Sequence, residues 1–327
     1  MRPHGAAPLV LTSGDPSGVG PELAVKARVH LGANLPFFWL GDPRHLPDNT
    51  AISVITDPAQ AISVPGHVLP VMVHDFASPA LPAVPDPSNA AGVIEVIARA
   101  VALVQAGAAS AVCTAPINKK ALKDGAGFAF PGHTEYLAHL AGVARVVMML
   151  ACPGLRVVPA TIHIPLAQVP TALTEALLET TIRITHAALI SDFRLTNPRI
   201  AVAGLNPHAG EGGAMGWEDE RMIRPLIARL ADEGMAIRGP LPADTMFHAG
   251  ARAGYDAAIC AYHDQALIPI KTIDFAGGVN VTLGLPFVRT SPDHGTAYDI
   301  AGTGVADPSS LIAALRMAAG MAAARLG

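Results

Sequence analysis

The chain has 327 residues, of which 51% are hydrophobic, 15% charged and 5% aromatic, and its formal net charge is −4. This length allows a large buried core and two lobes, and the weak negative charge excludes a basic surface for nucleic acid or an anionic membrane. Because aromatic residues are scarce, we expect a core of Ala, Val, Leu and Ile. The low charged fraction favours extensive buried sheet or a surface covered in an oligomer.

Short apolar runs alternate with longer helical patterns along the chain. The runs are continuous rather than alternating, which is typical of parallel strands covered on both faces. The pattern therefore predicts an α/β protein built from βαβ units, with a proline-rich surface excursion at 77–87. Strands are expected at 8–12, 37–40, 51–55, 68–71, 111–114, 146–150, 157–162, 199–203 and 257–261, and helices at 20–31, 89–106, 167–193, 219–233 and 308–325.

The cysteines Cys113, Cys152 and Cys260 are widely spaced and form no CxxC pair. They are expected to be buried, reduced thiols of a cytoplasmic protein. Residues 1–8 lack the apolar core of a signal peptide, and no uncharged apolar stretch reaches about 18 residues. We therefore expect neither a leader nor a membrane span.

Three histidines, His163, His208 and His263, each follow an apolar run. The carboxyl ends of parallel strands open onto the ligand crevice of an α/β fold, and neutral imidazole is a common metal ligand. The repeated layout predicts a three-histidine metal site with positions left open for substrate. Taken singly, each of these histidines is better explained as a simple strand-end cap, and it is the repetition that favours the metal site.

A glycine-rich loop at 12–22 follows the first expected strand and opens a helix. Its glycines, Gly14, Gly18 and Gly20, do not match GxGxxG, and no Gly-Lys-Ser/Thr follows, which excludes a Rossmann fingerprint and a Walker A loop. The loop either brings backbone amides to a ligand at a helix N-terminus or is a tight turn that needs glycine. A second segment rich in small residues, 293–308, either wraps a nucleotide or connects flexibly.

Two short segments carry candidate anion contacts. Lys119 and Lys120 follow an apolar run and are either a solvated helix start or an anion contact. His133 and Thr134 offer an imidazole and a hydroxyl for a phosphate oxygen, whereas Thr134 alone is equally suited to cap a helix.

Lys271, Asn280 and Arg289 lie in a largely uncharged stretch near the third histidine. A guanidinium offers a bidentate fork for phosphate or carboxylate. This group predicts a site for an anionic substrate.

Six motifs occur in order: GDPSGVGPE at 14–22, PGHTE at 131–135, LNPHAGEGG at 205–213, GPLPADT at 239–245, YHDQ at 262–265 and VNVTLGLP at 279–286. Together they resemble the 4-hydroxythreonine-4-phosphate dehydrogenases of pyridoxal phosphate biosynthesis, from about residue 9 to the C-terminus. The opening loop and HGTAYDIAG at 294–302 are also similar to the isocitrate and isopropylmalate dehydrogenases, which bind NAD(P) without a Rossmann fingerprint.

The resemblance implies two α/β/α lobes with a cleft between them, the first from 1–127 plus 279–327 and the second from 128–278. It implies an NAD- or NADP-dependent oxidation of 4-phosphooxy-L-threonine at C3 to 2-amino-3-oxo-4-phosphooxybutanoate. Loss of CO2 then gives 3-amino-2-oxopropyl phosphate. It further implies a homodimer that shares a zinc, cobalt, magnesium or manganese ion across its interface.

The resemblance also assigns roles to individual residues. The metal ligands are His163, His208 and His263. The substrate contacts are His133, Thr134, Lys271, Asn280 and Arg289. The cofactor contacts are Gly14, Asp15, His294, Gly295, Thr296 and Asp299, and the candidate catalytic residues are Lys271, Asp244 and Asp264.

Two segments depart from the family pattern: Ala214 stands where many relatives carry histidine, and 276–278 differ from the usual sequence. Relatives that oxidise phosphorylated threonate or erythronate share the site residues, so those substrates remain an alternative. A three-histidine zinc hydrolase and a non-catalytic binding protein for a metal or phosphometabolite are the competing classes.

Overall fold

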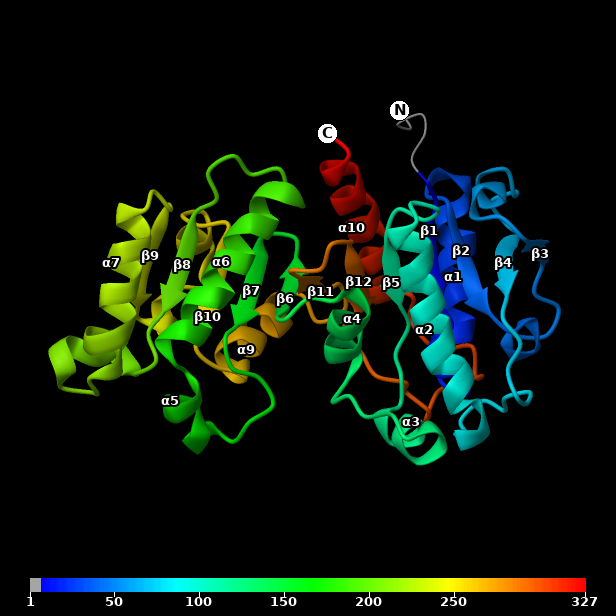
Figure 1. Cartoon of the computed structure of the whole chain (residues 1–327), viewed down its shortest axis with the longest axis horizontal. Helices are drawn as coiled ribbons and strands as arrows, with labels where there is room; N and C mark the ends of the chain where they lie inside the picture. Colours follow the sequence, from blue (N-terminus) through cyan, green and yellow to red (C-terminus); the bar gives the residue numbers. More distant parts are fainter. Residues whose placement is uncertain (1–6) are drawn as a thin grey trace. The chain divides into compact units, whose positions relative to one another are not determined.

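The computed structural model describes residues 7–327, which form two compact α/β units (Figure 1). Unit 1 consists of the described residues up to Val146 together with Leu285–Gly327, and unit 2 is Val147–Gly284. Residues 1–6, part of the segment expected to lack a leader, lie outside the described residues. The α/β class expected from the sequence is confirmed.

The division between the units falls at 146/147 and 284/285, whereas the sequence led us to expect 127/128 and 278/279. Segment 128–146 lies in unit 1 because Phe128, Tyr136 and Leu137 are buried in the core of that unit. Segment 279–284 lies in unit 2. His133 and Thr134 therefore belong to the same unit as Arg289.

All neighbouring strands of unit 1 pair in parallel, in the order β3-β4-β2-β1-β5-β12. Both faces are covered, and every residue of β1 is buried. The strands are β1 (Leu9–Thr12), β2 (Phe37–Gly41), β3 (Ile52–Ile55), β4 (Leu69–Val73), β5 (Val112–Thr114) and β12 (Arg289–Pro292).

Helix α2 lies across β1 and β5 (Figure 1), and it buries Val93, Val96, Ile97 and Ala100 at the spacing of one helical face. The stretch Pro87–Gln105 is long and apolar enough to cross a membrane, yet this inner side is buried in the core of unit 1. The helices of the unit are α1 (Gly20–Leu31), α2 (Ala90–Gln105), α3 (Lys119–Ala126), α4 (His133–Ala141) and α10 (Ser309–Arg325).

Unit 2 has a mixed sheet in the order β11-β6-β7-β10-β8-β9. The sequence led us to expect parallel strands throughout, but β6 pairs antiparallel with both β7 and β11. The β6–β7 connection is Pro153-Gly154, and Gly154 has φ +83°, as the third residue of a type II turn requires. The strands are β6 (Val147–Cys152), β7 (Leu155–Pro159), β8 (Ile200–Ala203), β9 (Ile237–Leu241), β10 (Ala257–Cys260) and β11 (Val279–Leu283).

The single helix expected at 167–193 is in fact broken. A 3-10 turn and the short α5 (Val169–Ala172) end before Thr174, whose hydroxyl accepts from the Leu177 N–H at 3.2 Å and caps α6 (Glu175–Ser191). The other helices of the unit are a π-helical turn (Asp219–Ile223) that continues into α7 (Arg224–Asp232), then α8 (Ala249–Arg252) and α9 (His263–Ile273).

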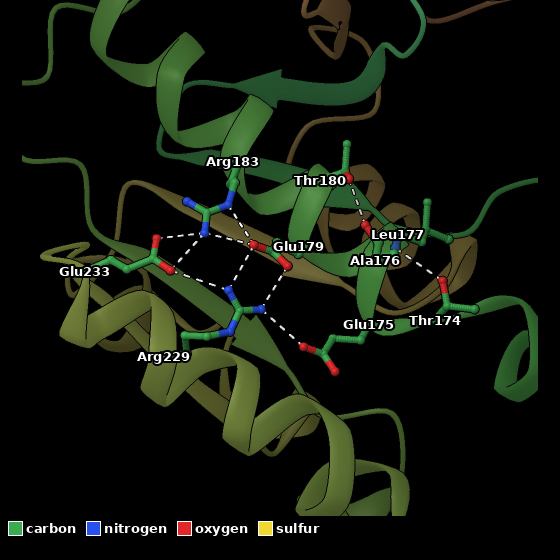
Figure 2. A network of polar contacts seen from close by, with 9 residues as sticks. All are labelled: Thr174, Glu175, Ala176, Leu177, Glu179, Thr180, Arg183, Arg229 and Glu233. Atoms are coloured by element: carbon green, nitrogen blue, oxygen red, sulfur yellow. Dashed lines mark hydrogen bonds and ion pairs between the residues drawn. The ribbon is translucent and has the colours of Figure 1, made fainter.

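An ion-pair network joins α6 to α7 on the surface of unit 2 (Figure 2). Arg229 pairs with Glu175 at 3.1 Å and Glu179 at 2.8 Å, and Arg183 pairs with Glu179 at 2.8 Å and Glu233 at 2.7 Å. The hydrogen bonds from Arg229 and then Arg183 lower the pKa of Glu179 to about 2. The network fixes how the two helices lie against each other.

The core is mainly aliphatic, as expected, but unit 1 concentrates the few aromatic residues. In β2, Phe37, Phe38 and Trp39 have no exposed surface. The expectation of a purely aliphatic core is therefore wrong for this unit. The three cysteines are free and buried, as the sequence indicated.

Candidate active site

The loop that joins β1 to α1 needs glycine for two reasons. Gly14 has φ +66°, and a Cβ at this position would lie 2.5 Å from the carbonyl oxygen of Pro116. At Gly18, a Cβ would lie 2.8 Å from the carbonyl oxygen of Thr296. The glycines thus let the loop approach the 293–299 segment closely, and both segments belong to unit 1.

Side chains join the same two segments. The hydroxyl of Tyr298 donates to Asp15 Oδ2 at 2.6 Å and accepts from Asn118 Nδ2 at 2.8 Å. Burial raises the pKa of Asp15 despite these bonds, and burial together with the Asp15 contact raises the pKa of Tyr298 to about 12. The buried Asp15 and the half-buried Tyr298 form an acid–phenol pair at the predicted cofactor loop.

The remaining predicted cofactor residues occupy one loop of unit 1. His294 Nδ1 lies 2.9 Å from the carbonyl oxygen of Gly295, and its Nε2 is buried with no hydrogen-bond partner among residues 7–327. Gly295 faces open space, and Asp299 is exposed. The loop therefore offers accessible backbone and an imidazole nitrogen that has yet to be paired.

Arg289 occupies the first position of β12, beside the parallel strand β5. Its guanidinium is only 3% exposed and donates to the hydroxyl of Thr114, at 2.6 Å from Nη2 and 3.2 Å from Nε. Burial lowers the pKa of Arg289 to about 10, so the group stays charged at neutral pH. A buried cation of this kind is ready to receive an anion.

His133 begins α4 in the same unit. Its Nε2 is buried and makes no hydrogen bond in the described part of the chain. Burial, and then the charges of Arg289 and Lys119, hold its pKa well below the usual value, so the imidazole is neutral. We call Thr114, His133 and Arg289 the anion pocket.

Thr134 does not cap the helix, contrary to one of the two interpretations of the sequence. The N-cap of α4 is Gly132, and Thr134 is the second residue of the helix. Its hydroxyl is thus not used as an N-cap acceptor, and a phosphate contact of His133 and Thr134 stays a prediction.

In unit 2 the three predicted metal ligands follow three adjacent parallel strands. His163 follows β7, His263 follows β10 and His208 follows β8, and the strand order is β7-β10-β8. The hydroxyl of Thr161 donates to the Ala261 carbonyl at 2.7 Å and ties the first two strand ends together.

Gln265 ties the second and third strand ends. It accepts from the Ala261 N–H at 2.6 Å and donates to the Gly204 carbonyl at 2.8 Å. The strand ends that precede His163, His263 and His208 are thus joined by side-chain hydrogen bonds as well as by the sheet.

His163 and His263 lie close together, with ring centroids 5.6 Å apart, and both line an open pocket with Asp264. His263 Nδ1 lies 2.7 Å from Asp264 Oδ1. Among residues 7–327, no group of three or more His, Cys, Asp or Glu side chains is arranged to hold a metal ion. The structure therefore brings two of the three histidines together, and His208 stands on a separate turn.

That turn has an unusual backbone. Every residue of His208–Gly213 has positive φ, from +43° at Glu211 to +99° at Gly213. His163 is also left-handed, with φ +52°. Non-glycine residues in this region carry strain, and such strain clusters at functional sites. We call His208–Gly213 the histidine turn.

Asp219 anchors the histidine turn and was not identified from the sequence. Its carboxylate is fully buried and accepts from the backbone N–H groups of Leu205 at 2.8 Å and Asn206 at 3.1 Å, and from Asn206 Nδ2 at 3.0 Å. A Cβ at Gly210 would lie 3.2 Å from Asp219 Cβ, so the carboxylate side chain also packs against the turn.

The other predicted residues of unit 2 are more exposed. Lys271 in α9 places Nζ 5.1 Å from the ring centroid of Phe275, which is itself 79% exposed. Asn280 in β11 has a buried Oδ1 without a hydrogen-bond partner among the described residues. Asp244 is exposed in a 3-10 turn and contacts neither the histidine pair nor the pocket that it lines.

Sequence reasoning missed Asp219, Gln265 and Tyr298. Tyr298 lies inside the HGTAYDIAG motif, so that motif already contained a signal for it. Gln265 likewise lies inside the YHDQ motif, although the motif does not reveal the Gly204 carbonyl, 61 residues away, that it contacts. Asp219 lies in none of the motifs, and it acts through backbone N–H groups 13 and 14 residues away.

Comparison with known proteins identifies the family. Residues 35–318 match the family model described as pyridoxal phosphate biosynthetic protein PdxA. A 4-hydroxythreonine-4-phosphate dehydrogenase from Paracoccus denitrificans is 66% identical over 324 residues, which is 98% of this chain and 99% of that protein. One from Roseobacter denitrificans is 64% identical over 318 residues, covering 97% and 98%.

Solved structures support the same family assignment. A 4-hydroxythreonine-4-phosphate dehydrogenase from Klebsiella pneumoniae matches with a TM-score of 0.88 at 37% identity, covering 97% of this chain and 99% of that one. A terephthalate 1,2-cis-dihydrodiol dehydrogenase from Burkholderia xenovorans matches with a TM-score of 0.69 at 28% identity, covering 96% and 98%. The resemblance drawn from the six motifs is thus confirmed, and the chain belongs to the PdxA family of pyridoxal phosphate biosynthetic proteins.

Proposed function

We propose that this chain is an oxidoreductase of vitamin B6 biosynthesis that oxidises 4-phosphooxy-L-threonine at C3. A hydride leaves C3 for NAD or NADP and the hydroxyl loses its proton, which gives 2-amino-3-oxo-4-phosphooxybutanoate. Loss of CO2 from this β-keto acid gives 3-amino-2-oxopropyl phosphate. The observation that carries the proposal is the buried Arg289 guanidinium beside the neutral His133, in a family whose relatives are named for a phosphorylated substrate.

The anion pocket would hold the phosphate. Arg289 supplies a fixed charge and a planar fork, and the unpaired Nε2 of His133 supplies a further hydrogen-bonding atom. Thr134 adds a hydroxyl from the first turn of α4. In unit 2, Lys271 and Asn280 would bind the remaining polar groups of the substrate, because Asn280 Oδ1 is buried and unpaired in the described chain.

The residues present fit a divalent metal. His163 and His263 already lie side by side, and Asp264 engages Nδ1 of His263, which leaves Nε2 as the nitrogen free for a ligand bond. We propose that His163, His208 and His263 hold a zinc, cobalt, magnesium or manganese ion, with both subunits of a homodimer contributing. When bound, the ion lowers the pKa of the substrate hydroxyl and polarises the product carbonyl.

The loops around Asp15 and Tyr298 fit a nicotinamide nucleotide. Gly14, Thr296 and the open Gly295 offer backbone at close range, and His294 Nε2 is a buried polar atom that a ligand can pair. When bound, the nucleotide accepts the hydride. Asp15 and Asp299 are acidic, which suits hydroxyl groups of the ribose as hydrogen-bond donors.

Three residues of unit 2, Asp264, Lys271 and Asp244, are the candidates for a role in proton movement. Asp264 contacts His263 directly and can orient its ring, so we assign it a positioning role. Lys271 is proposed to contact the substrate, and Asp244 is the weaker candidate because it lies outside the pocket. The three free, buried cysteines support a reducing, cytoplasmic location.

The test is nucleotide reduction followed by absorbance at 340 nm. Phosphothreonine, phosphothreonate and phosphoerythronate are each offered with NAD and with NADP, in the presence of each candidate metal. We expect turnover with phosphothreonine, loss of turnover in the His208→Ala variant, and a dimer by analytical ultracentrifugation. Turnover only with the acids lacking the amino group would reassign the substrate. Hydrolysis without reduction would establish the zinc hydrolase, and metal or phosphate binding without either reaction would establish a binding protein.

A further inference from the structure

Lys119 and Lys120 begin α3, but their side chains differ in whether they form an ion pair. Lys120 forms an ion pair with Asp124 one turn later. Lys119 forms no ion pair in the part of the chain that the structure describes, and it is not a hydrogen-bond donor to any of these residues. The two adjacent lysines are therefore a matched pair for substitution: Lys120 has an ion-pair partner among the described residues, and Lys119 has none.

Helix stability does not explain Lys119. The N-terminal turn of a helix carries partial positive charge, which favours anions and disfavours a lysine. Asn118 already caps the helix by accepting from the Ala121 N–H at 3.1 Å, so the cap needs nothing from its neighbour. Lys119 is exposed, so its ammonium is solvated, and the helix dipole gives it no stabilising role at this position.

The ammonium lies beside the anion pocket of the same unit. A Cβ at Gly132, the N-cap of α4, would lie 3.2 Å from Lys119 Cε and 3.4 Å from Nζ. His133 follows directly, and the charges of Lys119 and Arg289 both act on its imidazole. Glu135 Oε2 would lie 3.4 Å from the same Cβ, but it forms no ion pair with Lys119 within residues 7–327.

The charges in the pocket are not balanced for a phosphate without Lys119. A phosphate monoester carries a charge of about −1.5 to −2 at neutral pH. Arg289 supplies one positive charge, and His133 is neutral because its pKa is held well below the usual value. A second cation in unit 1 would match the charge of a dianion.

We propose that Lys119 is this second cation, a substrate-binding residue that makes the anion pocket select a phosphoryl dianion over a singly charged group. The proposal rests on the proposed function, which assigns the phosphate to Arg289 and His133. It adds a residue, and a reason for specificity, that the three-histidine and five-residue sets do not contain.

The experiment measures binding of two small probes, ethyl phosphate and ethyl sulfate, to the purified full-length protein by calorimetry at pH 8 in buffer free of phosphate. The probes have the same shape but differ in charge. The variants are Lys119→Met, Lys119→Arg, the matched control Lys120→Met, and Arg289→Met as the reference for loss of the pocket. Thermal unfolding of each variant is recorded alongside.

We expect Lys119→Met to bind ethyl phosphate about tenfold more weakly and ethyl sulfate nearly as well as the wild type does, because the lost contact is one charge-assisted bond to the second negative charge. Lys119→Arg retains phosphate selectivity, and Lys120→Met is unchanged. The Tm of Lys119→Met equals or exceeds that of the wild type, which a structural role would not allow.

Two outcomes overturn the proposal and are distinguishable. If Lys119→Met binds ethyl phosphate like the wild type while Arg289→Met does not bind it, the pocket is real and Lys119 is outside it. If the wild type itself fails to bind ethyl phosphate, or if Arg289→Met binds it as well as the wild type does, the assigned phosphate site is wrong. The proposed role of Lys119 is then wrong as well.

Discussion

The anion pocket of unit 1 and the histidine turn of unit 2 are held in place by opposite means. In the pocket, regular elements carry the side chains: Arg289 opens β12 and His133 opens α4. In the turn, His208 lies on a left-handed backbone that contains three glycines and begins next to the backbone that Asp219 binds. The anion pocket has regular backbone, and its cost lies in the burial of a charged group. The histidine turn bears its cost in strained backbone dihedral angles instead.

This difference shows where each region is vulnerable. Burying the charge of Arg289 and the neutral imidazole of His133 costs free energy that a bound anion would restore. The left-handed turn costs conformational energy, which the hydrogen bonds to Asp219 offset. Substitutions in the pocket should therefore harm ligand binding more than folding, and substitutions at Asp219 should harm both.

The largest effect is expected at Arg289. Arg289→Met should lower kcat/KM about a thousandfold, because a buried charge-assisted contact to the substrate is lost. Burial lowers the pKa of Arg289 from 12.5 to about 10, which corresponds to roughly 3 kcal/mol against the buried charge. The variant should consequently be at least as stable as the wild type in urea unfolding. A variant that is inactive because it is unfolded would contradict the comparison.

Asp219→Asn should have the next largest effect. The substitution keeps the shape but points an amide N–H at the backbone N–H groups of Leu205 or Asn206, so we expect a loss of about 2–3 kcal/mol of stability. Metal affinity should fall about tenfold or more, as for other residues that position a ligand.

Both effects at Asp219 can be followed without turnover. Trp217 packs over Gly213 of the turn, whereas Trp39 is fully buried in unit 1, so fluorescence of Trp217 in a Trp39→Phe background reports the turn. Zinc or cobalt titration gives the affinity. Glu220→Gln, which removes only a surface pair with Arg224, is the control and should change neither. Unaltered metal binding in Asp219→Asn would show that the turn does not present a ligand.

Stability of the ligand-free protein should depend on pH through His133. Its folded pKa is depressed, so the unfolded chain takes up the proton first as pH falls through about 6.5. Stability is therefore complete above that pH and declines below it, by at most about 1.4 kcal/mol per pH unit from this group. Urea unfolding at several pH values should show the decline, and His133→Asn should reduce its slope. An identical slope in the variant would mean that other groups cause it.

The smallest effect is expected at Glu211, which is exposed in the turn with φ +43°. Glu211→Gly removes the clash of a Cβ in the left-handed region and should stabilise the protein by about 1 kcal/mol. Glu211→Ala keeps the Cβ and should give no gain. Loss of stability in the glycine variant would indicate that the side chain has a role that its position does not suggest.

Local patterns predicted the elements whose signals are local. Helix α1 has the expected bounds of 20–31, and α10 differs by one residue from the expected 308–325. The helix at 167–193 was wrong because the apolar periodicity continues through the break, although Thr174 was a readable capping residue. Strands β9, β11 and β12 were not predicted. Polar residues interrupt the short apolar runs of β9 and β11, and β12 has no apolar run at all, since its sequence is Arg-Thr-Ser-Pro.

The site residues also divide into those with a local sequence signal and those without one. Gly14 and the three histidines could be selected from sequence because the chain places each one directly after an apolar run or in a recognisable motif. Asp219 could not, because it is defined by the backbone that it contacts. Gln265 lies in the YHDQ motif, but its role depends on the distant backbone that it contacts. Lys119 could not be distinguished from Lys120 until the ion pair of Lys120 was known.

The sequence by itself determined the α/β class, the family and the positions of the histidines, because strand periodicity and ordered motifs are properties of neighbouring residues. Only the tertiary structure decided that β7, β10 and β8 are adjacent, that Arg289 lies against Thr114, and that Nε2 of His133 is buried and the pKa of the imidazole depressed. These are relations between segments as much as 175 residues apart. They depend on sheet order and burial, which arise only when the whole unit folds.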